Sequence, residues 1–114
     1  MRVHHIALRT HDLVRLERFY VHVLGLAVKR RNAERSVWLA AGDTILMLER
    51  AEPNEPKIPE GSQEFFAFAI SPEQKLTFRE TLTTAGITLE HETSTTIYFR
   101  DPDGRRVGLS HFTE

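Results

Sequence analysis

Residues 5–26, HIALRTHDLVRLERFYVHVLGL, carry the pattern that decides the fold. In the stretch Val3–Leu8, Ile6 and Leu8 alternate with His5 and Ala7, which is the two-residue period of a strand. After Thr10 or Asp12, either of which can cap a helix, apolar residues recur at three- and four-residue steps. Gly25 is a natural residue to end that helix. The segment therefore predicts a strand followed by a helix.

Three short segments rich in β-forming residues follow this helix. They lie near Ala27–Arg31, Val37–Ala40 and Thr44–Glu49, and Gly42–Asp43 marks a hairpin turn between the last two. The first part of the chain, residues 1–51, is thus expected to fold as a βαβββ module.

Residues 52–62 contain three prolines and a glycine among charged residues, so we expect an exposed connector there. The same order of elements then returns over residues 63–114. A strand over Phe65–Ile70 precedes a helix that Ser71 caps, and Gly86 ends it. The first turn of this helix, with Pro at its first position and Gln at its third, is typical of a capping box. The expected strands after it are Thr88–His91, Thr95–Arg100 and Arg105–Ser110.

The two copies can be aligned residue by residue with a period of about 60 residues. The aligned segments are residues 5–8 with 65–68 and residues 37–39 with 97–99, and the last strands align with Met47 opposite Gly108. Each copy alone leaves one sheet face bare, so the copies must pair, within the chain or across a dimer. The expected fold class is α+β, two tandem βαβββ modules forming a cupped mixed sheet with helices on the outer face. We treat the chain as a single domain whose cup is the candidate ligand site.

Composition excludes several classes of protein. The chain has 114 residues, a formal net charge of −1 and no cysteine, so zinc ribbons, iron–sulfur sites and thiol chemistry are ruled out. The basic clusters Lys29–Arg31 and Arg105–Arg106 are too short for a nucleic-acid surface. The longest apolar run, Phe65–Ile70, is far too short to span a membrane, and no signal-peptide pattern opens the chain. We therefore expect a cytoplasmic protein without nucleic-acid or membrane partners.

Three segments together resemble the vicinal-oxygen-chelate superfamily, the group of glyoxalase I, extradiol dioxygenases, fosfomycin-resistance proteins and bleomycin-resistance proteins. They are the strand His5-Ile6-Ala7-Leu8, the helix from Asp12-Leu13 to Gly25-Leu26, and Tyr98-Phe99-Arg100-Asp101-Pro102-Asp103-Gly104. The resemblance implies paired βαβββ modules, usually in a homodimer. It also implies a divalent metal held by His and Glu side chains on the cup face of the first and last strand of each module.

The metal positions implied by the resemblance fall on His5, Met47, Phe65 and Gly108, of which only His5 carries a suitable donor. A catalytic divalent site needs about three nitrogen or oxygen ligands. We therefore interpret the metal site as lost and expect no cofactor. An alternative is a shifted site for nickel, zinc, manganese or iron, made by His5, Glu49 and a third group from the partner module. A further alternative is an alignment error of two residues, which would make Glu49 the family ligand itself.

Strand alternation also predicts what lines the cup. The residues expected there are His5, Ala7, Met47, Glu49, Phe65, Ala67, Gly108 and Ser110, with Trp38 and Tyr98 from neighbouring strands. The expected ligand contacts are His5, Trp38, Met47, Glu49, Phe65, Tyr98 and Ser110, and Arg106 is a further orienting group. Such an aromatic and thioether wall suits a flat or apolar organic ligand.

Other interpretations stay open for these side chains. His5 can be an inert remnant, and Glu49 at a strand end can be a solvated carboxylate. Trp38 and Tyr98 can serve a dimer interface or the core, and Met47 can help to fill the cup completely. His4 is expected on the face opposite His5, so this pair is not expected to chelate one ion.

Two functions follow. The first is a metal-independent small-molecule binding protein resembling bleomycin-resistance proteins, which holds an apolar or aromatic compound in the cup. The second is a glyoxalase- or dioxygenase-like metalloenzyme, a lyase, isomerase or oxidoreductase, with an altered metal shell around His5 and Glu49. If the chain is an enzyme without metal, these two residues are the expected acid and base.

Overall fold

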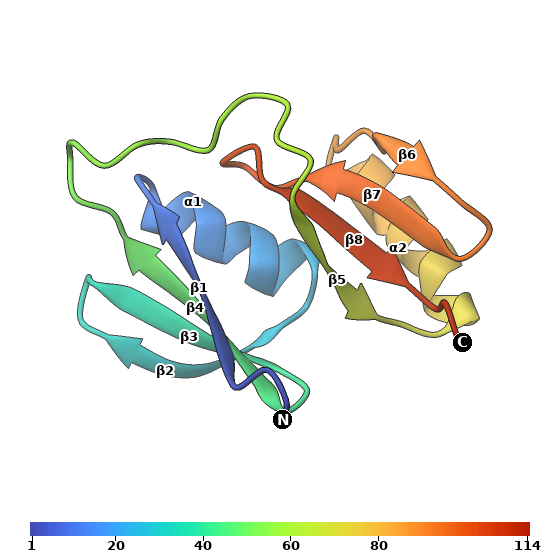
Figure 1. The fold of residues 1–114 in the computed structure, drawn as a ribbon, viewed down its shortest axis with the longest axis horizontal. Helices are drawn as coiled ribbons and strands as arrows, with labels where there is room; N and C mark the ends of the chain where they lie inside the picture. Colours follow the sequence, from blue (N-terminus) through green and yellow to red (C-terminus); the bar gives the residue numbers. More distant parts are fainter. The chain divides into compact units, whose positions relative to one another are not determined.

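The computed structural model describes residues 1–114, which form two compact units, Met1–Lys57 and Ile58–Glu114. The boundary falls inside the connector between the fourth and fifth strands, where there is no helix or strand. Figure 1 shows the connector as a long loop. Each unit is described by itself.

The first unit is a four-stranded mixed sheet with one helical segment. Its elements are β1 (His5–Thr10), α1 (Leu13–Arg18), the π-helix η1 (Phe19–Val23), β2 (Ala27–Asn32), β3 (Ser36–Ala41) and β4 (Thr44–Arg50). The strand order is β1-β4-β3-β2, with β1 parallel to β4 and the other pairs antiparallel. The expected βαβββ module is confirmed.

The second unit repeats this topology. Its elements are β5 (Phe65–Ala69), α2 (Pro72–Thr84), β6 (His91–Glu92), β7 (Thr96–Arg100) and β8 (Arg106–Ser110). The order β5-β8-β7-β6, with β5 parallel to β8, corresponds strand for strand to the first sheet. The register corresponds as well, because Ala7 pairs with Met47 and Ala67 pairs with Gly108. The residue alignment of the two copies is therefore confirmed.

The helix caps follow the sequence signals. Asp12 caps α1 by accepting a hydrogen bond of 3.1 Å from the backbone N–H of Arg15. Ser71 and Gln74 form the expected capping box at α2, with reciprocal hydrogen bonds of 3.1 and 2.8 Å. Each such cap satisfies backbone donors that the helix itself leaves unpaired.

The first strand is His5–Thr10 instead of Val3–Leu8, and most other strand ends lie within one residue of the expectation, but two elements differ more. The first helix widens into a π-helix, in which the N–H of Leu24 donates to the carbonyl of Phe19 five residues earlier. A three- and four-residue apolar period does not distinguish this turn from a regular helix. The second strand of the second module is not Thr88–His91 but only His91–Glu92, an exposed edge strand.

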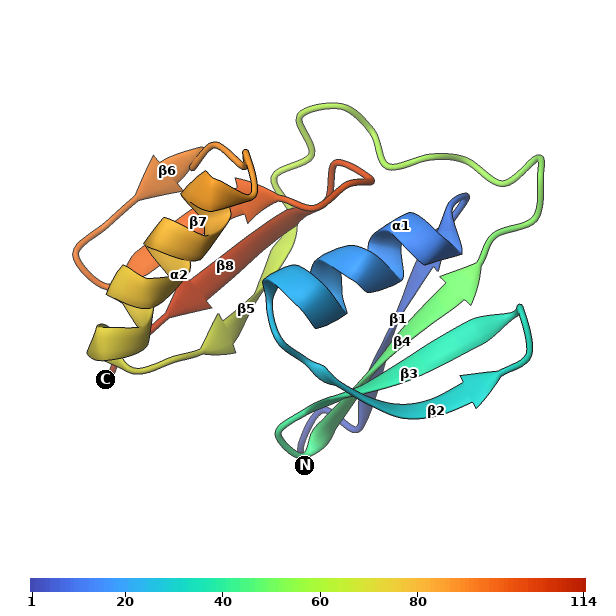
Figure 2. The ribbon, with the colours of Figure 1, turned by 180° about the vertical axis from the view of Figure 1, so that it is seen from behind.

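Each unit has its own core between its helix and one face of its sheet (Figure 1, Figure 2). The largest fully buried side chains are Leu16, Tyr20, Leu39, Leu46 and Leu48 in the first unit, and Leu82, Ile97, Phe99, Val107 and Leu109 in the second. Burying one such side chain contributes about 1.5–3 kcal/mol. Neither helix has the length and hydropathy of a membrane-spanning segment.

The turn between β7 and β8 is held by a buried carboxylate. Asp101 is 4% exposed and accepts hydrogen bonds from the backbone N–H groups of Asp103 and Arg105, at 2.9 and 3.1 Å. The guanidinium of Arg105, itself buried, donates to the same carboxylate at 2.7 Å. Leaving one member of such a pair buried without its charged partner is costly.

We therefore expect Asp101→Asn to lower the free energy of unfolding by about 3 kcal/mol, because it removes the charge of the nearer of the two carboxylates beside Arg105, at 2.7 Å against 3.6 Å for Asp103. Urea unfolding followed by circular dichroism measures this. Asp43→Asn, in the exposed turn between β3 and β4, is the matched control and should change stability by less than about 0.5 kcal/mol. Equal effects of the two substitutions would contradict the role of Asp101.

Candidate functional site

Each sheet has one face against its helix and one open face. In the second unit, Phe65 and Ala67 of β5 are exposed, whereas Val107 and Leu109 of the neighbouring β8 are buried. Residues two apart on a strand share a face. The open faces carry all the candidate site residues: His5, Trp38, Met47 and Glu49 in the first unit, and Phe65, Tyr98 and Ser110 in the second.

Trp38 and Met47 form an apolar patch on the open face of the first sheet. They are directly paired across β3 and β4, and both side chains are half-buried. The guanidinium carbon of Arg30 lies 5.1 Å from the centre of the Trp38 ring. The indole N–H is buried without a hydrogen-bond partner, which is unfavourable for a donor. Trp38 and Met47, two members of the expected aromatic and thioether wall, are thus neighbours on this sheet face.

Glu49 belongs to an ion-pair network at the end of β4. One carboxylate oxygen lies 3.5 Å from the guanidinium of Arg9, which also donates two hydrogen bonds to Glu55, at 3.0 and 2.7 Å. The hydrogen bonds from Arg9, followed by that from the backbone N–H of Glu52, lower the pKa of Glu55 to about 2. Glu55 stays charged at neutral pH, so Arg9 lies against two carboxylates. The environment of Glu49 fits the solvated, ion-paired interpretation.

His5 is exposed and contacts His4, contrary to the expectation that the two point to opposite faces. His4 precedes β1, so strand alternation does not govern its side chain. The two rings meet edge to face with centroids 5.1 Å apart, and their Nδ1 atoms are 2.9 Å apart. One nitrogen of His5 is thus already engaged by its neighbour.

The residues of the first unit do not fit a metal site built on His5 and Glu49. His5 pairs with Ile45, and Glu49 lies four residues beyond it on the same strand. At about 3.3 Å per residue, the two Cα atoms are about 13 Å apart along the strands. That span is too long for two side chains to reach one ion at bond lengths of about 2 Å. Within either unit, no group of three His, Asp or Glu side chains could hold a metal ion.

A stack of two aromatic rings and a guanidinium occupies the open face of the second unit. The rings of Phe65 and Tyr98 meet edge to face with centroids 5.0 Å apart. The guanidinium carbon of Arg106 lies 4.4 Å from the centre of Tyr98 and 5.4 Å from that of Phe65. His91 stacks on Tyr98 with a centroid distance of 6.0 Å. The positive charge of Arg106 therefore lies next to Phe65, the residue that corresponds to His5 in the first unit.

Glu90 holds this arginine in place. Its carboxylate accepts two hydrogen bonds from Arg100, at 2.6 and 2.9 Å, and lies 3.2 Å from Nε of Arg106. The hydrogen bonds from Arg100 lower the pKa of Glu90, and the charge of Arg106 acts in the same direction. Arg106 also donates to the side chain of Gln63 at 3.2 Å. The guanidinium of Arg106 is therefore paired with Glu90 and hydrogen-bonded to Gln63.

Gly108 leaves the space that Tyr98 occupies. A Cβ atom at this position would lie 3.2 Å from the Cβ of Ala67 and 3.3 Å from the Tyr98 ring, closer than ordinary contact. The resemblance implies a metal-binding side chain at this position. The Cβ atom of such a side chain would be in tight contact with the Tyr98 ring. Phe65 has no donor atom. The second unit therefore offers no metal ligand at either position, and its residues do not fit the metal that the resemblance implies.

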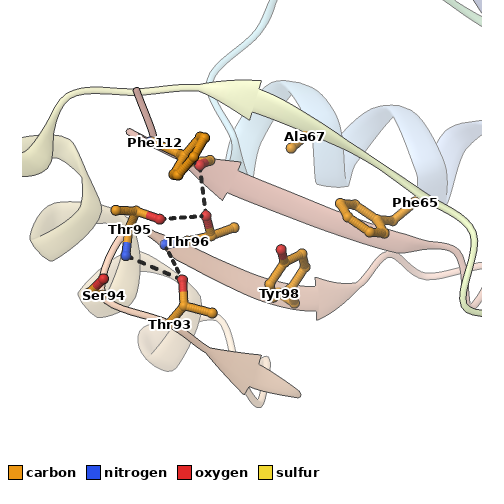
Figure 3. Close-up of a pocket in the computed structure, with 9 residues that line it drawn as sticks. Phe65, Ala67, Thr93, Ser94, Thr95, Thr96, Tyr98 and Phe112 are labelled. Atoms are coloured by element: carbon orange, nitrogen blue, oxygen red, sulfur yellow. Dashed lines mark hydrogen bonds between the residues drawn. The ribbon is translucent and has the colours of Figure 1, made fainter. Parts of the chain in front are cut away.

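Beside the stack lies a pocket of about 510 Å³ (Figure 3), within the usual range for small-molecule sites. Its lining residues are Phe65, Ala67, Thr93, Ser94, Thr95, Thr96, Tyr98, Ser110 and Phe112. Figure 3 shows the side chains of residues 93–96 gathered at one end and the rings of Phe65 and Tyr98 at the other. The pocket brings together three predicted ligand contacts, Phe65, Tyr98 and Ser110.

The polar end of the pocket is a chain of hydroxyl groups. Oγ1 of Thr96 lies 2.7 Å from Oγ of Ser110 and 3.2 Å from Oγ1 of Thr95. Ser110 Oγ also accepts from the backbone N–H of Phe112 at 3.1 Å. Thr93 Oγ1 accepts from the backbone N–H groups of Thr95 and Thr96, at 3.3 and 3.0 Å. The loop that bounds the pocket is therefore ordered by its own side chains.

Lys75 of α2 fixes the same loop from the opposite side. It is 7% exposed, and its Nζ donates to the carbonyls of Thr93 and Ser94, at 2.9 and 3.1 Å. The same Nζ is 3.2 Å from a carboxylate oxygen of Glu92, so the ammonium charge is paired and does not face the pocket.

Sequence reasoning missed the residues of the pocket rim. Thr93, Ser94 and Thr95 lie in a loop, and Phe112 follows the last strand, so strand alternation gives no information about them. The signal that could have identified them is the run of four hydroxyl residues, 93–96, directly before the strand that carries Tyr98. Serine and threonine hydroxyls frequently bond to nearby backbone in such loops.

Comparison with known proteins gives one family. The model of the Glyoxalase/Bleomycin resistance protein/Dioxygenase superfamily matches residues 2–109 of the chain. No curated protein matches the sequence.

Solved structures of similar fold cover nearly the whole chain. The lactoylglutathione lyase of Agrobacterium tumefaciens is 26% identical with a TM-score of 0.75, covering 96% of this chain and 92% of that one. A glyoxalase/dioxygenase from Nostoc punctiforme is 25% identical with a TM-score of 0.79, covering 99% and 92%. The fosfomycin resistance protein FosX of Listeria monocytogenes is 17% identical with a TM-score of 0.82, covering 98% and 92%. The last likeness is one of fold alone.

The packing of Tyr98 on Gly108 leads to a stability prediction. Gly108→Val should lower the free energy of unfolding by about 1–3 kcal/mol, because its side chain overlaps the ring and Ala67. In a Tyr98→Ala background the added cost should shrink by at least about 0.5 kcal/mol, since one obstacle is gone. Urea unfolding of the four proteins in this double-mutant cycle measures the difference. The same cost in both backgrounds would show that the ring is not the obstacle.

Proposed function

Because the chain belongs to the Glyoxalase/Bleomycin resistance protein/Dioxygenase superfamily, we propose that it is a metal-independent small-molecule binding protein resembling the bleomycin-resistance proteins. Its ligand is an apolar or aromatic compound held on the open sheet face of the second unit. The observation that carries this proposal is the pocket bounded by Phe65, Tyr98 and Phe112 on its apolar sides.

The shape and lining of the pocket suit a flat organic molecule. Aromatic side chains offer large, rigid contact surfaces and favour edge-to-face packing with a ligand ring. Phe65 is 48% exposed and Phe112 is 65% exposed, so both rings have apolar surface for a ligand to cover. The small side chain of Ala67 leaves room above the strand. Covering this exposed apolar surface is the driving force that we expect for binding.

The donor chemistry supports binding without a metal. The four family positions carry one imidazole, a thioether, a phenyl ring and no side chain at all. The thioether of Met47 is a soft ligand that does not suit hard divalent ions. The alternative metalloenzyme requires His5 and Glu49 around one ion, and their separation along β1 and β4 does not favour it. The homodimer expected from the resemblance stays a prediction.

The first test is metal retention. Purified untagged protein is incubated with excess nickel, zinc, manganese and ferrous ions, desalted, and measured by mass spectrometry. We expect no near-stoichiometric retention of any of these ions, because no set of three suitable ligands exists within either unit. Retention close to one ion per chain that disappears in His5→Ala would overturn the proposal in favour of the metalloenzyme.

The second test is binding in the presence of chelator. With EDTA present, naphthol, naphthamide and naphthoate serve as aromatic probes, followed by backbone amide NMR shifts. At least one probe should shift the amides of residues 65–67 and 93–98, and Phe65→Ala should weaken that binding about 5-fold or more, because contact area is lost. Leu76→Ala, at an exposed position of α2, is the matched control and should bind normally.

Loss of binding on adding EDTA would contradict metal independence. Binding that Phe65→Ala leaves unchanged would contradict the location of the site. Absence of binding for all three probes at millimolar concentration would contradict the proposed function itself.

A further inference from the structure

We propose that the pocket on the second unit selects neutral aromatic ligands that carry an uncharged hydrogen-bonding group, such as an amide, and discriminates against anionic ones. This inference rests on the function proposed above. It adds the chemical class of the ligand and the two residues, Thr96 and Ser110, that form hydrogen bonds with its polar group.

No lining residue of the pocket carries a charge. One end is aromatic and the other end consists of hydroxyl-bearing residues from the loop 93–96 and Ser110. An ionised carboxylate moved from water into such a site loses hydration and gains no opposite charge, which is costly. A neutral amide or hydroxyl loses much less hydration and can recover it through hydrogen bonds.

Two basic side chains that contact residues of the pocket, Lys75 and Arg106, are paired with other groups. The ammonium of Lys75 donates to the carbonyls of Thr93 and Ser94 and pairs with Glu92. The guanidinium carbon of Arg106 lies 4.4 Å from the centre of the Tyr98 ring, and the guanidinium is paired with Glu90 and hydrogen-bonded to Gln63. Neither Lys75 nor Arg106 is among the residues that line the pocket. An anion in the pocket therefore finds no salt-bridge partner on its walls.

The loop does not offer a backbone anion site either. The N–H groups of Thr95 and Thr96 both point at Oγ1 of Thr93, and that of Phe112 points at Oγ of Ser110. Backbone N–H groups that converge on a vacant space make an anion-binding concavity. Here the side chains of the loop already take up these donors.

The linked hydroxyl groups of Thr95, Thr96 and Ser110 have one hydrogen that is not used between them and can be donated to a ligand. Thr95, Thr96 and Ser110 carry three hydroxyl protons, and two hydrogen bonds link them. Each hydroxyl donates once and accepts up to twice. The chain can therefore donate one further hydrogen bond, and its oxygens keep accepting capacity. A neutral group that both donates and accepts, such as a carboxamide, matches this set.

The aromatic and hydroxyl ends fix how the ligand lies. The ring of the ligand packs against Phe65 and Tyr98 at the apolar end, whereas Phe112 flanks the hydroxyl end (Figure 3). Its polar substituent then reaches the pair Thr96 and Ser110, which lie opposite each other on β7 and β8. Because Lys75 anchors the loop carbonyls, the hydroxyl groups are held in place before the ligand arrives, which lowers the entropic cost of binding.

The experiment compares two isosteric probes at neutral pH, naphthamide and naphthoate, which differ in charge but not in shape. Affinities are measured by NMR titration of the full chain in the presence of EDTA. We expect naphthamide to bind at least about 10-fold more tightly than naphthoate, with shifts in the amides of Thr96 and Ser110.

Removing the hydroxyls should remove the discrimination. In Thr96→Val/Ser110→Ala, affinity for naphthamide should fall about 5- to 10-fold while naphthoate changes little. Ser110→Ala alone should give a smaller loss in the same direction, which keeps the test valid if the double variant does not fold. Thr83→Val is the matched control, because its hydroxyl bonds only to a carbonyl of α2, and it should retain the wild-type preference.

The outcomes separate the two proposals. Equal or tighter binding of naphthoate at the same amides would overturn the selectivity and leave the binding function standing. A preference for naphthamide that survives Thr96→Val/Ser110→Ala would overturn the role of the hydroxyls. If neither probe shifts the pocket amides at millimolar concentration while naphthol does, the inference is overturned and the binding function stands; if naphthol also fails, both are overturned.

Discussion

Parallel pairing of the first and last strand in each unit is the constraint on which the rest of the structure depends. Parallel neighbours cannot be joined by a hairpin, so the chain must leave the first strand through a helix and return through two further strands. The helix can cover only one face of the sheet. The register of the parallel pair then decides which residues meet on the open face, and it is the same in both units, with Ala7 beside Met47 and Ala67 beside Gly108.

One backbone frame therefore carries two different surfaces. In the first unit, the open face combines the Trp38 and Met47 patch with ion pairs around Arg9. In the second unit, the absence of a side chain at Gly108 lets Tyr98 lie against the strand. That ring supports both Arg106 and the wall of the pocket. A single position without a Cβ atom thus removes a metal ligand and makes room for an aromatic surface.

Most of the fold could be predicted from the sequence, because each signal was local. The capping box at Ser71, the glycine after the first helix and the alternation in β1 depend on residues within a few positions of one another. The π-helix after Arg18 was missed, since its hydrogen bonds shift by one residue without changing the apolar pattern. The site was predicted only in part, because alternation identifies strand residues and gives no information about the loop Thr93–Thr95 or about Phe112. The ion pair of Arg106 with Glu90 joins strand β8 to the segment just before β6, and sequence spacing does not reveal it.

Membership in the family does not determine the chemistry of this chain, because the fold supplies positions and the side chains supply function. The open face could hold a cation only if its own positive charges were absent or distant. Instead, Glu90 holds Arg106 over the rings, where the guanidinium would repel a divalent ion next to Phe65. Arg106 contacts Tyr98 and Phe65 but does not itself line the pocket, and its pairing with Glu90 offsets its charge, so the lining surface is aromatic and hydroxylic. The interaction that makes the site unsuitable for a metal is therefore also the one that makes it suitable for a neutral ligand.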